Sequence, residues 1–201
     1  MNYLTSSKLV RPSKILLYKI LYSDIKNNFD FKNSHFCDLA CGHAQLLKDF
    51  KFSRYVGVDL DLNQININKK NHPNCLFVHK DISKYTAKNK FDFITIIECI
   101  GINKDFNIDV INDLFLNIRL NIKKRGNVCF NIRRDLYDKN KILLNNFFLE
   151  FYEITITNYG YFYKKKFFLF AKILFLTEFV ISRFFNIKGK YIYFFCKNFK
   201  N

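Results

Sequence analysis

The chain has 201 residues, of which 49% are hydrophobic and 18% aromatic, and it carries a formal net charge of +16. This length suits one domain with a sizeable buried core, and so apolar a composition excludes an intrinsically disordered chain. A net charge of this sign attracts polyanions such as nucleic acid or anionic lipid. Lys and Asn are abundant together with Phe and Ile, as in proteins of AT-rich genomes, so codon bias is an alternative source of the charge.

Helices and strands are predicted to alternate along the first two thirds of the chain. Apolar runs predict strands at His35–Leu39, Arg54–Asp59, Cys75–His79, Phe91–Ile97 and Asn127–Ile132. Apolar residues at helical spacing predict helices at Lys14–Ile25, through Leu46 and Leu47, at Leu62–Lys70 and at Val110–Ile122, with Gly126 ending the last of them. Such alternation is typical of an α/β fold with a doubly wound, mostly parallel sheet.

The region after Arg134 departs from this alternation. It contains a predicted helix at Ile142–Phe148, a sixth strand at Phe151–Thr157 and a last strand at Lys190–Lys197. Between the last two strands lies the most apolar segment, Phe167–Phe185, whose length approaches the roughly 20 residues of a membrane-spanning helix. Its charged residues argue against a span, because a charge near the centre of such a helix costs about 2.5–3.5 kcal/mol. The segment is predicted either to cover the functional site or to contact a lipid or a partner.

Cysteine usage and the first residues bear on the cellular compartment. The six cysteines include no Cys-x-x-Cys pair, and His72 with Cys75 is too small a set for a metal site. We therefore predict reduced structural thiols and no bound metal. The segment Met1–Arg11 is too polar for a secretory signal peptide, so the expected location is the cytoplasm, with peripheral membrane contact through Phe167–Phe185 as an addition.

Four acidic residues, each at or next to the end of an apolar run, carry the chemical signal of this sequence. They are Asp38, Asp59, Asp81 and Glu98. Because the carboxyl ends of parallel strands meet at one edge of a sheet, where open α/β folds bind ligands, these side chains are predicted to line a common site. Such a rim suits a ligand that carries an ammonium and a sulfonium group. The alternative is that the acids only cap the following helices, as Asp61 is expected to do.

On these residues the chain resembles the class I S-adenosylmethionine-dependent methyltransferases, most clearly over residues 30–135. The run Asp38-Leu39-Ala40-Cys41-Gly42-His43-Ala44 is similar to the family's first motif, with Ala in place of two usual glycines. The resemblance implies the following cofactor contacts: Asp38, Ala40 and Gly42 at the methionine half, Asp59 at the ribose hydroxyls, Leu60 beside the adenine, Asp81 and Ile82 at the adenine edge, and Glu98 between the methionine moiety and the acceptor.

The resemblance also implies an architecture. It is a single domain over residues 1–201, with a Rossmann-like, mostly parallel seven-stranded sheet whose last strand is antiparallel. A helical segment, residues 1–33, precedes the sheet, and an apolar lid over about 160–189 separates the last two strands.

The catalytic residues are less clear than the cofactor contacts. Many relatives have Glu-His at the end of the fourth strand, whereas this chain has Glu98-Cys99, so the general base stays unassigned and His43 and Glu98 are the candidates. The fourth strand also lacks the Asn-Pro-Pro-Tyr-like motif of relatives that methylate exocyclic amines of bases or glutamine amides.

Three functions follow from these observations. The first is a methyltransferase that uses S-adenosyl-L-methionine and acts on a small acceptor, apolar or lipid-linked. The second is an RNA methyltransferase that binds its substrate with the basic surface. The third is a non-catalytic domain that binds the cofactor or docks on a membrane or a partner.

Overall fold

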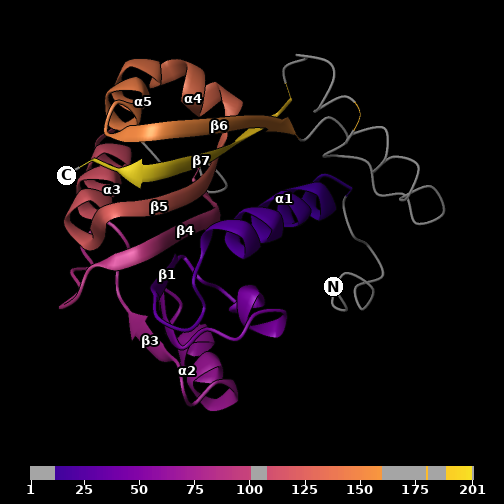
Figure 1. The fold of residues 1–201 in the computed structure, drawn as a ribbon, viewed down its shortest axis with the longest axis vertical. Helices are drawn as coiled ribbons and strands as arrows, with labels where there is room; N and C mark the ends of the chain where they lie inside the picture. Colours follow the sequence, from indigo (N-terminus) through magenta and orange to yellow (C-terminus); the bar gives the residue numbers. More distant parts are fainter. Residues whose placement is uncertain (1–11, 101–107, 160–179, 181–188, 201) are drawn as a thin grey trace.

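The computed structural model describes residues 12–100, 108–159, 180 and 189–200, and a seven-stranded sheet runs through their centre (Figure 1). The strand order is β3-β2-β1-β4-β5-β7-β6. The strands are β1 (His35–Leu39), β2 (Arg54–Asp59), β3 (Leu76–His79), β4 (Phe91–Ile100), β5 (Ile122–Arg133), β6 (Phe151–Tyr159) and β7 (Tyr191–Phe199). The first five pair in parallel, and β7 pairs antiparallel with both β5 and β6, which confirms the predicted sheet.

Helices cover both faces of the sheet. One hydrophobic core joins the sheet to α1 (Pro12–Asn28), the 3-10 helix η2 (Gln45–Lys48) and α2 (Leu62–Asn71). The other joins it to α3 (Ile108–Asn121), α4 (Arg134–Lys139) and α5 (Lys141–Phe148). Neighbouring residues of β4 serve different cores, since Phe93 belongs to the first and Ile94 to the second. A strand buried on both faces is therefore apolar throughout, as the sequence of β4 is.

Aromatic packing fills both cores. On the α3 side, the rings of Phe115 and Phe147 stack with centroids 4.2 Å apart, and Phe130 of β5 contacts both. On the α1 side, Phe36 lies between Phe52 and Phe93, at centroid distances of 4.3 and 5.5 Å. Full burial of one such side chain contributes about 1.5–3 kcal/mol, so these rings supply much of the driving force for the three-layer arrangement.

Two predictions of secondary structure are wrong. The predicted helix through Leu46 and Leu47 is a four-residue 3-10 helix, because Ala44 before it has a left-handed backbone and its side chain makes no capping hydrogen bond. The predicted break at Gly126 lies inside β5, which already begins at Ile122. A register shift in the pairing with β4 accommodates Gly126 there, and an added Cβ would lie 2.6 Å from Cγ1 of Ile122.

Several smaller predictions can be compared with the fold. Asp61 caps α2, since its side chain accepts from the backbone N–H of Gln64, and all six cysteines are free thiols. The structure adds the short helix α4, which the sequence analysis did not anticipate. Within the described ranges, no helix combines the length and hydropathy needed to cross a membrane. The predicted lid and Phe167–Phe185 lie outside the described residues apart from positions 180 and 189.

Candidate active site

The strand-end carboxylates converge at one edge of the sheet. Asp59 ends β2 and Asp81 follows β3, the neighbouring strand, while Cys99 lies near the end of β4. Burial, with smaller contributions from the charges of Asp59 and Asp81, raises the pKa of the Cys99 thiol to about 12. Asp59 pairs with His79 of β3, and the backbone N–H of Lys80 donates to the carbonyl oxygen of Asp59 at 3.0 Å, so Asp59 and Asp81 lie at neighbouring strand ends on one carboxyl edge.

The turn after β1 has an unusual backbone. Ala40, Gly42 and Ala44 all have positive φ angles, of 59°, 46° and 48°. A Cβ added at Gly42 would meet no atom within 4 Å, so one side of this turn is open to an approaching ligand. The left-handed conformation, and not crowding, is what favours glycine at position 42.

Asp59 fastens this turn to the end of β2. Its Oδ2 accepts a hydrogen bond of 2.8 Å from the backbone N–H of Gly42, and its Oδ1 accepts one of 3.0 Å from the backbone N–H of Asp61. A carboxylate has about four lone-pair sites, so both oxygens keep the capacity to accept a further bond from a ligand hydroxyl.

Asn68 of α2 holds the turn from the other side, and the sequence analysis missed it. Its Nδ2 donates to the carbonyl oxygen of Gly42 at 2.6 Å, while its Oδ1 accepts from Nε2 of Gln64 at 3.1 Å. The side chain is only 2% exposed. An amide three residues after the buried Ile65, on the inner face of an amphipathic helix, is the sequence signal that identifies such a residue.

We expect Ala40→Gly to stabilise the protein by about 1 kcal/mol, because a left-handed backbone strains any residue with a Cβ. Chemical denaturation of wild type and variant measures the free energy of unfolding. Ala87→Gly is the matched control, since Ala87 is not among the described residues with positive φ, and the extra flexibility of the unfolded chain should then lower stability. Equal effects of the two substitutions would contradict a strained turn.

Asp38 differs from the other acids because it is buried, with 6% of its surface exposed. Its Oδ2 accepts from the Tyr55 hydroxyl at 2.9 Å and its Oδ1 from the Thr95 hydroxyl at 2.8 Å. Burial raises the pKa of this carboxyl to about 6 against the opposing effect of both hydroxyls. The side chain thus ties β1 to β2 and β4 directly below the turn.

The residues predicted at the adenine end lie in two neighbouring loops. Oδ1 of Asp81 accepts bonds of 2.9 Å from the backbone N–H and the hydroxyl of Ser83, and Oδ2 has no hydrogen-bond partner in the part of the chain that the structure describes. Ile82 is buried and Leu60 is 64% exposed. The loop carrying Leu60 contacts β3, since its carbonyl oxygen lies 3.0 Å from Nε2 of His79.

Glu98, the fourth predicted acid, is held in a left-handed backbone with φ 56°. The side-chain oxygen of Asn131 in β5 accepts from its backbone N–H at 2.7 Å. Oε2 of Glu98 pairs with Nζ of Lys14 in α1 at 2.6 Å. Neither partner was predicted. Asn131 could have been noticed as an amide within the apolar run of β5, whereas the pairing with Lys14 depends on tertiary structure. His43 is exposed on the turn.

This set of groups fits S-adenosylmethionine. The ligand needs acceptors for ribose hydroxyls, an adenine amine and positive charges, and the edge offers carboxylates at Asp59, Asp81 and Glu98 beside an open turn at Gly42. Carboxylates accept hydrogen bonds and donate none, so they match the ribose hydroxyls, the adenine amine and the two cationic groups of this ligand.

Comparisons with known proteins agree with the fold. Residues 36–126 match the family model described as a methyltransferase domain. The N-methyltransferase NodS from Bradyrhizobium japonicum WM9 is similar over 94% of this chain and 97% of its own, with a TM-score of 0.62 and 9% identity. Its complex with S-adenosyl-L-homocysteine is similar over 97% and 90%, with a TM-score of 0.65 and 11% identity. A search of curated proteins finds no significant match.

At such low sequence identity, the solved structures show that the fold is shared and nothing more. The family model covers the segment that contains the turn after β1 and all of β2. The residues that match the family model include all four predicted acids, Asp38, Asp59, Asp81 and Glu98. Taken together, the strand order and the antiparallel β7 give this chain the fold of the solved N-methyltransferase structures, and residues 36–126 are similar to a methyltransferase domain.

Proposed function

We propose that this protein transfers a methyl group from S-adenosylmethionine to a small-molecule acceptor at the edge formed by β1, β2 and β4. The observation that carries the proposal is that Asp59, at the end of β2, and Asp81, just beyond β3, lie at neighbouring strand ends beside the open turn at Gly42. Asp59 would accept from the ribose hydroxyls, and Asp81 from the adenine amine, next to Ile82 and Leu60. Asp38 would act from beneath, by holding the strand ends that carry Ala40 and Gly42.

Positioning is the main contribution that these residues can make to the reaction. When bound, S-adenosylmethionine supplies the methyl group, which passes to the nucleophilic atom of the acceptor as its bond to sulfur breaks. Asn131 fixes the backbone of Glu98, and Lys14 pairs with its carboxylate. Glu98 and Lys14 would therefore present an ion pair to the bound acceptor. Holding two reactants in line removes much of the entropic barrier, so a dedicated base is needed only for an acceptor that must lose its proton early.

The location of the charges favours a small acceptor over RNA. The cavity lined by the basic residues Lys124 and Arg125 lies at the start of β5, whereas the carboxylates lie beyond the opposite ends of the parallel strands. RNA held at those cations would not reach the methyl donor directly. An apolar or lipid-linked acceptor depends on residues 160–189, and it stays a prediction, as do a cytoplasmic location and membrane contact.

The test is to incubate the protein with S-adenosylmethionine labelled in the methyl group and with separated metabolite, lipid, RNA and protein fractions of cells. We expect label in the small-molecule fraction, and label confined to RNA or protein would contradict the proposed acceptor. Titration calorimetry tests binding of the methyl donor separately from methyl transfer to the acceptor. No heat of binding up to millimolar S-adenosylmethionine would remove the donor site, whereas binding without transfer to any fraction would support the non-catalytic alternative.

A further inference from the structure

The opposite edge of the sheet carries a second feature, a cavity of about 510 Å³. It lies where β5 and β6 begin and β7 ends, because β7 runs antiparallel to both. We call it the basic cavity, and its lining residues are Lys124, Arg125, Tyr152, Asn198 and Phe199. It is therefore a strand length away from the carboxylates of the candidate active site.

The two cations of the basic cavity have no carboxylate partner within the described ranges. Lys124 and Arg125 are both exposed. The neighbouring acids already have cations of their own: Asp92 pairs with Lys123 at 2.8 Å, Glu153 with Lys197 at 3.0 Å, and Glu150 with Arg119. Two uncompensated positive charges at one cavity attract an anion.

An exposed aromatic ring lies beside these cations. Tyr152, the second residue of β6, is 72% exposed, whereas Phe151 before it is buried. Nζ of Lys200 lies 5.3 Å from the centroid of the Tyr152 ring. So exposed a ring offers aromatic surface to a planar ligand, and bases of single-stranded nucleic acids stack on such platforms.

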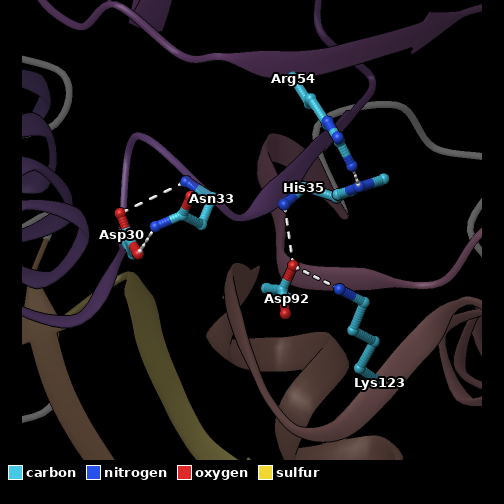
Figure 2. Close-up of polar contacts among 6 residues, drawn as sticks. All are labelled: Asp30, Asn33, His35, Arg54, Asp92 and Lys123. Carbon is cyan, nitrogen blue, oxygen red and sulfur yellow. Dashed lines mark hydrogen bonds and ion pairs between the residues drawn. The ribbon is translucent and has the colours of Figure 1, made fainter.

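A further cation lies along the starts of the parallel strands, where Figure 2 shows Arg54 beside His35 and Lys123 paired with Asp92. Arg54 at the start of β2 contacts Nε2 of His35 at the start of β1. Burial, together with the charges of Arg54 and Lys123, lowers the pKa of His35 against the opposing charge of Asp92, which favours the neutral ring that accepts from Arg54. Asp30 turns toward Asn33 instead of toward these cations, as Figure 2 shows.

The dimensions of this edge suit a chain of phosphates. Five strand intervals separate Arg54 in β2 from Tyr152 in β6. At the usual spacing between strands this amounts to about 24 Å, which is long enough for several nucleotides.

Backbone strain marks the same cavity. Among the described residues, five non-glycine residues have positive φ: Ala40, Ala44, Glu98, Arg125 and Asn198. The first three lie at the candidate active site, and the other two line the basic cavity. Asn198 is fixed there because its backbone N–H donates to the side-chain oxygen of Asn127 at 3.0 Å. Left-handed residues therefore occur at both places, the candidate active site and the basic cavity.

We propose that the basic cavity binds single-stranded nucleic acid, with Lys124 and Arg125 at phosphates and Tyr152 stacked on a base. The site is a docking surface separate from the methyl-donor site, and it does not rest on the proposed acceptor. Free nucleotides share the same chemistry but reach only one part of the edge, so they should bind much more weakly than an oligonucleotide.

The experiment is fluorescence anisotropy with a labelled oligouridylate of about 12 nucleotides, without S-adenosylmethionine. The double variant Lys124→Glu/Arg125→Glu should bind about tenfold or more weakly, and the slope of log affinity against log salt should fall by about 1.4. Lys139→Glu/Lys141→Glu, two exposed lysines of α4 and α5, changes the net charge equally and is the control. Tyr152→Ala should lose about fivefold or more and Tyr152→Phe little, because only the ring stacks.

Each outcome decides the proposal. All these side chains are exposed, so the variants should melt with the wild type, and melting curves check this. Equal affinities of the two double variants would overturn the proposal, and so would competition by free uridine monophosphate at the same concentration as the oligonucleotide. Flotation on phosphatidylserine vesicles without binding of the oligouridylate would assign the cavity to a membrane and overturn it as well.

Discussion

Asp59→Ala should weaken the binding of S-adenosylmethionine about 100-fold. The side chain would accept from both ribose hydroxyls, and a hydrogen bond to a charged group contributes about 1.5–3 kcal/mol. The substitution also removes the acceptor that fixes the N–H of Gly42, so the turn itself loses its anchor at β2. Titration calorimetry measures the loss directly.

A graded series distinguishes a lost ligand contact from a loosened fold. Asp59→Asn keeps one carbonyl oxygen at the same place, so it should lose about tenfold in affinity, less than Ala. Asp61→Ala, two positions away, removes the cap of α2 and should cost about 1 kcal/mol in unfolding free energy with affinity unchanged. If Asp59→Ala bound the ligand as well as Asp61→Ala does, the assignment of Asp59 to the ribose would be wrong.

The strands that position the site could be predicted closely from the sequence. The predicted bounds of β1 and β2 agree with the structure, because each is an apolar run that ends at a turn or an acid. Parallel strands then place Asp59 and Asp81 at one edge whatever the details of packing. The convergence of the acids is therefore a consequence of topology, which periodicity alone can indicate.

The local backbone of the turn could not be predicted in the same way. Ala44 has high helix propensity, yet its φ of 48° makes it the start of a four-residue 3-10 helix. Likewise, Gly126 looks like a helix break, but a register shift with Arg125 at φ 62° keeps it within β5. In both places tertiary packing against the sheet overrides local preference.

The side chains that contact these acids could not be predicted from the sequence either. Thr95, Tyr55 and Lys14 are distant from Asp38 or Glu98 along the chain, and no spacing rule connects them. These contacts change what each acid can do: Glu98 has a cation beside it, and Asp38 is shielded from water. Four acids that look equivalent in the sequence thus have four different environments in the fold.

The burial of Asp38 predicts that stability falls as pH rises from about 4 to about 6. A carboxyl in an unfolded chain releases its proton near pH 3.9, whereas in the folded protein burial raises the pKa of Asp38 to about 6. Between these values the folded state holds more protons than the unfolded state, so each rise in pH favours unfolding. A shift of about two units corresponds to about 3 kcal/mol, fully lost above the folded-state pKa.

Asp38→Asn isolates this effect, because the amide cannot ionise and still offers one oxygen to the hydroxyl of Thr95 or Tyr55. The measurement is urea denaturation of both proteins from pH 4 to pH 8. The unfolding free energy of the variant minus that of wild type should increase by about 3 kcal/mol across the window. Taking the difference cancels other carboxyls, including Asp24, whose pKa is also raised by burial, and Asp30, whose pKa is lowered by Asn33.

A second background tests whether the two acids interact. The charge of Asp59 is one cause of the raised pKa of Asp38. In an Asp59→Asn background, the pH range over which stability falls should therefore move to lower pH. Parallel stability curves for wild type and Asp38→Asn would show that Asp38 does not titrate in this range. A window that stayed in place with Asp59→Asn would instead leave burial as the only cause. In either background the measured window reports the electrostatic environment directly beneath the turn that carries Gly42.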